Sequence, residues 1–258
     1  MRTWILLRGL TRESGHWGGF LPSLQAGFPG DRIEALDLPG NGRLHAQRSP
    51  PDVAAMTHSA RQQLAERGLA PPYHVLAMSL GAMVTVDWAQ RYPGELAACV
   101  LINTSLRRFS PWYQRLRPAN LPPLLRVALG AAPGARREQT VLRLTSRHHQ
   151  GEPALLSAWA ELRSQRPVSG ANALRQLLAA LRYRPLMQPP SVPTLLLCSR
   201  RDGLVHPRCS HSLARRWQLP IREHPSAGHD LPLDDPDWVV AQLSAWLGDA
   251  VTTDQEPK

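Results

Sequence analysis

The sequence has 258 residues, and its fractions of hydrophobic (43%) and charged (19%) residues are those of a globular protein. No apolar run is long enough to cross a membrane, and the opening run WILL is too short for the core of a signal peptide. We therefore expect a cytoplasmic protein that does not contact a membrane. The three cysteines lack metal-type spacing, and no phosphate-binding or dinucleotide motif is present, so neither a metal nor another cofactor is expected.

The formal net charge of +10 is concentrated in one segment. Residues 107–190 contain 14 arginines against Glu138, Glu152 and Glu161, whereas the rest of the chain is nearly neutral. Because the charge is confined to this segment, we expect no nucleic-acid partner. Two interpretations of the arginines stay open: a solvated surface, or a docking surface for an acidic partner.

The first part of the chain alternates between strand and helix patterns. Short apolar runs predict buried strands over 3–10, 32–42, 73–79 and 96–103, and helical spacing predicts helices over 52–68 and 80–92. Nearly continuous apolar strands that alternate with helices are typical of a parallel sheet covered on both faces.

After Asn103 the strand patterns stop and helical patterns follow one another, at about 120–130, 136–147, 153–165 and 171–182. The alternation then resumes with a strand over 193–202, a helix over 207–217, a strand over 221–225 and a helix over 236–247. We therefore expect an α/β core with a mostly parallel sheet of about six strands and an all-helical insertion. The expected boundaries are a core of 1–105 and 191–249, a helical cap of 106–190 and a disordered tail of 250–258.

A small-x-Ser-x-Gly pattern, formed by Ala77, Ser79 and Gly81, lies where a predicted strand gives way to a predicted helix. In a strained strand-to-helix turn that exposes a nucleophilic serine, both flanking positions must be small, because bulky side chains would collide with the adjacent strand and helix. The alternative is an ordinary serine that caps a helix. The strand-turn-helix setting favours the nucleophile.

A serine hydroxyl needs a base to activate it, and the base needs an acid to orient it. Asp202 and His229 each lie on a loop just after a predicted strand, and the order Ser, Asp, His is that of α/β-hydrolase chemistry. Each of the three has an ordinary structural interpretation, but their joint placement favours a triad. Asp230, Asp234 and Asp235 are expected to cap helices instead.

The stretches ILLRGL, ALDLPGNGRL, VLAMSLGAMV, SRRDGLV and AGHDLPLDDPDWV resemble the landmarks of the α/β-hydrolase fold superfamily, in the same order. The resemblance covers nearly the whole chain and is closest to small capped carboxylesterases. It implies that the helical insertion is the cap, and that the backbone amides of Leu10 and Leu80 form the oxyanion hole.

Three features depart from the family pattern. Arg8 stands where the family usually has histidine before glycine, and Asn41 stands where a second histidine is usual. Only two residues precede the first strand, so the usual opening hairpin is not expected.

These residues predict a serine hydrolase that cleaves a carboxylic ester, or a thioester, of a small-molecule substrate through an acyl-enzyme. One alternative is a lyase or acyltransferase of the same fold that acts on an anionic or carrier-protein-linked substrate. Another is a non-catalytic binding protein on a hydrolase scaffold, which retention of all three triad residues disfavours.

The cap supplies the remaining candidates. Apolar side chains such as Trp112, Tyr113 and Trp159 either line an acyl pocket or form the core of the cap. An acidic carrier protein is a possible partner of the arginine-rich cap, and the candidate contacts are Arg107, Arg108, Arg115 and Arg117.

Overall fold

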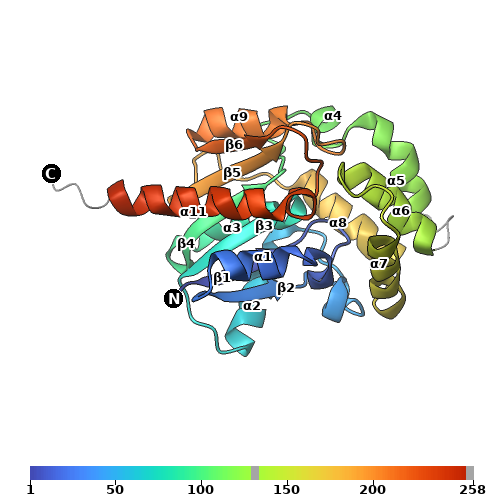
Figure 1. Cartoon of the computed structure of the whole chain (residues 1–258), viewed down its shortest axis with the longest axis horizontal. Coiled ribbons are helices and arrows are strands. Elements are labelled where there is room, and N and C mark those ends of the chain that lie inside the picture. The colour runs from blue at the N-terminus through green and yellow to red at the C-terminus, as the bar shows by residue number, and fades with distance from the viewer. Residues whose placement is uncertain (129–133, 254–258) are drawn as a thin grey trace.

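A computed structural model describes residues 1–128 and 134–253 (Figure 1). Six parallel strands form one sheet in the order β2-β1-β3-β4-β5-β6, which confirms the predicted sheet. The strands are β1 (Thr3–Leu7), β2 (Arg32–Leu36), β3 (Tyr73–Met78), β4 (Leu96–Ile102), β5 (Thr194–Ser199) and β6 (Ile221–His224). Several end earlier than the sequence pattern suggested, because the chain leaves the sheet at the first polar residue or glycine after the apolar run.

Helices cover both faces of the sheet. The core helices are α1 (Phe20–Gly27), α2 (Val53–Glu66), α3 (Leu80–Arg91), α9 (Arg208–Trp217), α10 (Leu231–Asp234) and α11 (Pro236–Thr253). Short 3-10 helices span Ser14–Trp17, Gly42–Leu44, Pro93–Glu95 and Pro118–Asn120. Alternate strand residues point to opposite faces, so the sheet divides its apolar side chains between two cores. One core packs under α1 and α11, and the other under α2, α3 and α9.

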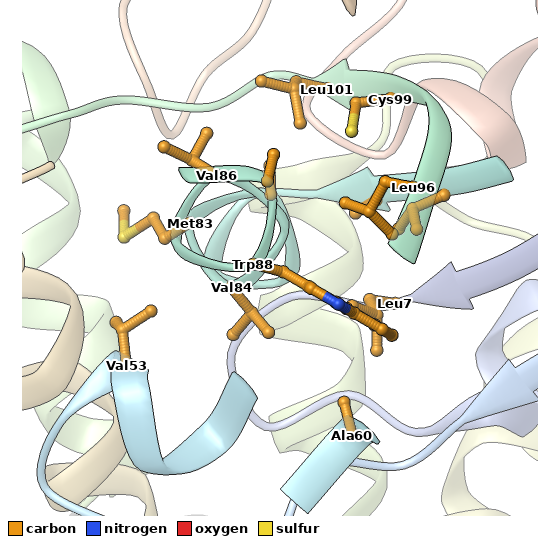
Figure 2. Close-up of a cluster of buried hydrophobic side chains, with 14 of the residues drawn as sticks. Leu7, Val53, Ala60, Met83, Val84, Val86, Trp88, Leu96, Cys99 and Leu101 are labelled. Carbon is orange, nitrogen blue, oxygen red and sulfur yellow. The ribbon is translucent and has the colours of Figure 1, made fainter. Parts of the chain in front are cut away.

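Helix α3 is the centre of the second core and carries the end of the candidate nucleophile turn. Val84 and Trp88 point from α3 toward α2, whereas Val86 faces the side of β4 (Figure 2). The indole N–H of Trp88 donates to a carboxylate oxygen of Glu95 at 2.8 Å, so the large ring is buried without an unpaired donor. Because α3 is buried on several sides, its position against the sheet is fixed. Its first residue, Leu80, directly follows Ser79 at the carboxyl end of β3.

The described part of the segment between β4 and β5 contains helices and no strand. It contains α4 (Trp112–Arg115), α5 (Leu121–Ala128), α6 (Gly134–Thr145), α7 (Pro153–Gln165) and α8 (Gly170–Arg182). Helices α5 to α8 gather at one end of the sheet, away from the C-terminus (Figure 1). This is the end where β3, β5 and β6 finish, so the helices stand beside the loops that carry the candidate site.

The last helix is longer than expected. α11 continues to Thr253, beyond the predicted end at residue 247, and so includes the first four residues of the expected tail. The remainder of that expectation, 254–258, lies outside the described residues. Among the described helices, none combines the length and the apolar character that crossing a bilayer requires.

Candidate active site

Ser79 occupies a strained turn between β3 and α3. Its φ of 54° and ψ of −115° are a conformation that side-chain-bearing residues rarely adopt, and its side chain makes no helix-capping hydrogen bond. A Cβ atom on Gly81 would lie 2.5 Å from the carbonyl oxygen of Leu7 and 2.7 Å from that of Arg8. The glycine is therefore required for α3 to start against the first strand. This geometry is that of a nucleophile turn and not of an ordinary capping serine.

Asp202 and His229 come from two different loops and form a buried pair. Nδ1 of His229 lies 2.7 Å from Oδ2 of Asp202, and the residues are only 3% and 2% exposed. The other carboxylate oxygen of Asp202 accepts from the amides of Leu204 (2.8 Å) and Val205 (2.9 Å). Three donors thus hold the carboxylate, which leaves Nε2 of His229 as the nitrogen available for other chemistry.

The end of β4 connects the serine turn with the histidine loop. The amide of Ser79 donates to the carbonyl of Ile102 at 3.0 Å, and the side-chain amide of the next residue, Asn103, donates to the carbonyl of His229 at 2.8 Å. Asn103 has a φ of 47°, which asparagine tolerates better than most residues, and its side chain also binds both the amide and the hydroxyl of Ser199. The backbones of Ser79 and His229 are therefore fixed on consecutive residues of one strand end.

The electrostatic environment of His229 favours its protonated form. Burial alone would lower the pKa of His229, but the ion pair with Asp202, and to a lesser degree the charge of Asp230, outweigh burial and raise the pKa above its ordinary value. An imidazole whose protonated form is stabilised in this way is suited to receive a proton and pass it on.

The loop after β1 presents backbone amides beside Ser79. A Cβ atom on Gly9 would lie 3.1 Å from Cβ of Ser79, so this loop passes directly against the serine. Within the described residues, the amide of Leu10 donates to no acceptor, and Leu80 is the first residue of α3, where helix amides lack an intrahelical partner. Both predicted oxyanion donors therefore have no hydrogen-bond acceptor within the described residues.

Asn41, at the position of the family histidine, fixes this same loop. The asparagine is fully buried, its side-chain amide donates to the carbonyl of Arg12 at 3.0 Å, and its oxygen accepts from Gln176 of α8 at 2.8 Å. Gln176 in turn accepts from the amide of Thr11 at 2.8 Å. The departure from the family pattern thus joins the loop after β1 to helix α8 through amide side chains.

Two of the three aspartates expected to cap helices do something else. Asp235 accepts from the amide of Trp238 at 2.9 Å, as an N-cap residue does. The carboxylate of Asp230 instead forms a bidentate ion pair with Arg8, and that of Asp234 accepts from the amide of Gly228 and the hydroxyl of Ser146. Asp230 does occupy the N-cap position of α10, but its side chain makes no capping bond. For Asp234, the last residue of α10, the cap expectation is wrong, because buried partners compete for its carboxylate.

A second buried ion-pair network joins the loop after β1 to the helical segment between β4 and β5. Glu138 of α6 is 1% exposed and binds Arg12 at 2.6 Å with one oxygen and Arg163 of α7 with the other. Burial alone would raise the pKa of Glu138, but the two arginines hold it below its ordinary value. The carboxylate therefore stays charged and links two cap helices with the core.

Trp159 belongs to this network. The guanidinium of Arg12 lies 4.2 Å from the centre of the Trp159 ring, and the His16 ring meets the same indole edge-on at 5.3 Å. His16 is buried next to Arg12, and burial followed by the charges of Arg12 and Arg8 lowers its pKa well below the ordinary value. A neutral His16 accepts from Arg12, whose Nη1 lies 2.8 Å from its Nε2. Trp159, at 3% exposure, is thus part of the cap–core interface.

The other two substrate candidates lie elsewhere. Trp112 and Tyr113 are exposed at 60% and 52%, and their rings meet edge-on with centres 6.1 Å apart. The structure therefore does not bring the three aromatic candidates together in one pocket.

The arginines of the candidate docking surface also divide. Arg115 is buried and donates to the carbonyls of Ala180 (2.6 Å) and Leu181 (3.4 Å), so it is a structural residue of the cap and not a surface contact. Arg117 lines a cavity of about 300 Å³ beside the loop that carries Asp202. The sequence did not predict this cavity. The cavity is lined by Arg117, Arg147, Arg200, Arg201 and Asp202.

One cluster has the residue types of a metal site. Among the described residues, Cys198, His211 and Glu223 have potential ligand atoms within 4.8 Å of one another. The carboxylate of Glu223 is shared between Arg200 (2.8 Å) and His211 (2.7 Å), and burial raises the pKa of the Cys198 thiol to about 12. These contacts describe an ion-pair cluster at the sheet edge, separate from Ser79.

Known proteins with this pattern place the chain in a family. A model of the alpha/beta hydrolase family matches residues 4–242. The chain is 29% identical over 220 residues to the pimeloyl-[acyl-carrier protein] methyl ester esterase of Methylococcus capsulatus, which covers 82% of this chain and 80% of that protein. The esterase of the same name from Aromatoleum aromaticum is 27% identical over 221 residues, covering 82% and 84%.

The solved structure of a thermophilic esterase from Thermogutta terrifontis has the same fold, with a TM-score of 0.74 and 21% identity over 96% of this chain and 90% of that one. These relatives confirm the resemblance to the α/β-hydrolase superfamily and to an esterase of this name. The chain belongs to the alpha/beta hydrolase family.

Proposed function

We propose that this protein is a serine esterase that uses Ser79, His229 and Asp202 as its catalytic triad. The observation that supports the proposal most strongly is the buried 2.7 Å contact between Nδ1 of His229 and Asp202, which leaves Nε2 of the imidazole without a hydrogen-bond partner among the described residues. The backbones of His229 and Ser79 are linked through the end of β4. A histidine oriented by a buried carboxylate next to a serine on such a turn is suited to nucleophilic acyl transfer.

In the first half of the reaction, Nε2 of His229 takes the hydroxyl proton of Ser79 as the serine oxygen attacks the ester carbonyl carbon. The carbonyl oxygen becomes an oxyanion, which the amides of Leu10 and Leu80 stabilise; one such donor contributes about 3 kcal/mol in comparable enzymes. The imidazolium, stabilised by Asp202, then returns the proton to the departing alcohol. An acyl group remains on Ser79.

In the second half, water takes the place of the alcohol. His229 accepts a proton from the water as its oxygen attacks the acyl-enzyme, and the same oxyanion site stabilises the intermediate. Collapse releases the carboxylic acid, and the proton on His229 returns to Ser79.

For the substrate, we propose a methyl ester of an acyl chain carried on acyl carrier protein. Relatives that share about 80% of their length with this chain bear that activity in their names. The arginine-lined cavity beside Asp202 supports the proposal, because guanidinium groups bind phosphate and carboxylate oxygens in a bidentate manner. Arg147 and Arg201 are exposed there, and neither forms an ion pair with a described carboxylate. Arg107 and Arg108, in the same arginine-rich segment, are also exposed.

The test compares two substrates of the same acyl chain: a carrier-protein-linked methyl ester and the free monomethyl ester. We expect the wild type to prefer the carrier-linked ester, with a preference that declines as salt is added, because the attraction between exposed charges is screened. The double variant Arg147→Glu/Arg201→Glu should reduce the preference about tenfold or more. Arg216→Glu, an exposed charge in the last turn of α9, is the matched control and should not change it.

Two outcomes would contradict the substrate assignment. Equal rates on both esters at low salt would show that the carrier protein is not part of the preferred substrate, while the proposed esterase activity would still stand. Products other than the acid and methanol would indicate a lyase or an acyltransferase.

A further inference from the structure

The guanidinium of Arg8 contacts a neighbour of each candidate catalytic residue. Its Nη1 lies 3.0 Å from Sδ of Met78, the residue before Ser79, and 3.0 Å from Oδ1 of Asp230, the residue after His229. Its Nη2 lies 2.5 Å from the second oxygen of Asp230. One side chain thus connects the strand that carries the serine with the loop that carries the histidine.

The ion pair between Arg8 and Asp230 is shielded from water. Their side chains are 2% and 3% exposed, and the guanidinium also packs against the ring of Trp17, 4.8 Å from its centre. Taking two charges out of water costs several kcal/mol per ion, so a buried pair is favourable only with very good geometry. The parallel two-bond contact meets this condition, and it fixes orientation as well as distance.

The backbone of Arg8 is part of the same arrangement. Its carbonyl lies against Gly81, and the following two residues are Gly9, which touches Ser79, and Leu10, the proposed oxyanion donor. On the other side of the pair, the amide of Asp230 donates to the carbonyl of Thr145 in the cap at 2.8 Å. A displacement of Arg8 therefore moves the oxyanion loop relative to the histidine loop.

We propose that the Arg8–Asp230 ion pair is a positioning element that holds the Leu10 oxyanion donor at a fixed distance from the imidazole of His229. This inference rests on the proposed esterase function and adds two residues that do not touch the reacting atoms. In this chain, the arginine that replaces the usual family histidine carries out the positioning through a partner 222 residues away in sequence.

The pair also balances charge around His229. The charged groups near the imidazole are Asp202 on the acid loop, Asp230 beside it in sequence, and Arg8 from the loop after β1. Asp234, the last residue of α10, accepts from the amide of Gly228, the residue before His229. The segment between β4 and β5 contributes the carbonyl of Thr145, which accepts from the amide of Asp230. Asp202 and Asp230 raise the pKa of His229, and Arg8 lowers it. Removing one member of the pair leaves the effect of the other unopposed.

Four variants separate charge from geometry: Arg8→Gln, Arg8→Lys, Asp230→Asn and the double variant Arg8→Gln/Asp230→Asn. The readouts are the pH profile of kcat/KM on a p-nitrophenyl ester, kcat and KM measured separately, and the titration of His229 by imidazole NMR. Arg8→Gln should move the acid limb to higher pH, and Asp230→Asn should move it to lower pH. The double variant should restore the wild-type limb, yet its kcat should stay about tenfold or more below wild type.

Arg8→Lys keeps the charge but loses the two-bond fork. It should therefore keep the wild-type acid limb and show the same loss of kcat, with KM nearly unchanged. Glu95→Gln is the matched control, because it breaks a two-bond ion pair with Arg61 that lies remote from the candidate site. It should lower the unfolding temperature without changing the pH profile or kcat.

Coincident acid limbs in the single variants, with kcat within twofold of wild type, would overturn the proposal and leave the pair a structural contact. If Asp230→Asn does not fold, Arg8→Gln and Arg8→Lys decide, because only the first should move the limb. A wild-type protein that cleaves no ester would overturn the proposed function instead. The NMR titration of His229 would then still show whether Arg8 and Asp230 shift its pKa in opposite directions.

Discussion

Asp202→Asn changes the charge of the buried acid while keeping its shape. Oδ1 of Asp202 accepts from the amides of Leu204 and Val205, and an asparagine oxygen at that place keeps both bonds. The asparagine NH₂ group then replaces Oδ2 and faces Nδ1 of His229. Because this group donates, Nδ1 must accept, and Nε2 then carries the proton and no longer accepts the one from Ser79.

The expected result is a loss of about 10⁴-fold in kcat, the effect that this tautomer change has in other serine hydrolases with a triad. That loss corresponds to about 5 kcal/mol of activation free energy. The unfolding temperature should change by only a few degrees, because the two amide bonds to the loop persist. The acid limb should also move to lower pH, since Asp202 supplies the larger of the charges that raise the pKa of His229.

The assay is steady-state hydrolysis of a short p-nitrophenyl ester, normalised by the fraction of folded protein. Asp235→Asn is the control: its carboxylate caps the amide of Trp238 and does not touch His229. It should keep full kcat and change the free energy of unfolding little, because asparagine caps a helix about as well as aspartate. If Asp202→Asn retained more than a tenth of the wild-type kcat, Asp202 would not be the acid that orients His229.

Three further predictions concern the cap, the serine turn and pH. Glu138→Gln leaves the guanidinium groups of Arg12 and Arg163 without a charged partner. It should lower the free energy of unfolding, measured in urea, by about 3 kcal/mol. A loss below about 0.5 kcal/mol would show that the network does not stabilise the fold. Gly81→Ala should abolish activity, because the added Cβ would lie 2.5 and 2.7 Å from two backbone carbonyl oxygens. Gly94→Ala, whose Cβ would meet no atom within 4 Å, is the control and should leave activity unchanged. An active Gly81→Ala protein would contradict the claim that α3 must start this close to β1. Since the pKa of His229 is raised, the neutral imidazole is lost as pH falls through a value above the ordinary 6.5, and kcat/KM should fall there too; an acid limb below 6.5 would contradict the assigned charges.

The sequence predicted the fold and the three proposed triad residues because both depend on local patterns and on a general rule of topology. Apolar runs alternating with helices predict parallel strands, and residues that follow such strands must meet at one edge of the sheet. Ser79, Asp202 and His229 each follow a strand, so this rule made them the candidate triad without knowledge of any contact; of the expected contacts, the structure shows the one between Asp202 and His229.

The contacts between loops were not predictable in the same way. Arg8 and Asp230 lie 222 residues apart, and Glu138 lies 126 residues from Arg12, so no periodicity or motif connects them. The available signal was the departure of Arg8 from the family histidine, which marked the position but not the partner. The sequence could not distinguish the buried Trp159 from the exposed Trp112, because the burial of each depends on how the helices between β4 and β5 pack against the core.

The most direct test of the account is the reaction of the protein with a fluorophosphonate, which forms a covalent bond with an activated serine. Peptide mass spectrometry should find one adduct per chain, on Ser79, and ester hydrolysis should disappear in proportion to the labelling. Ser79→Ala should take up no label and hydrolyse no ester. Labelling of a different residue, or ester hydrolysis that continues after Ser79 is fully modified, would contradict the central claim that Ser79 is the activated nucleophile of this site.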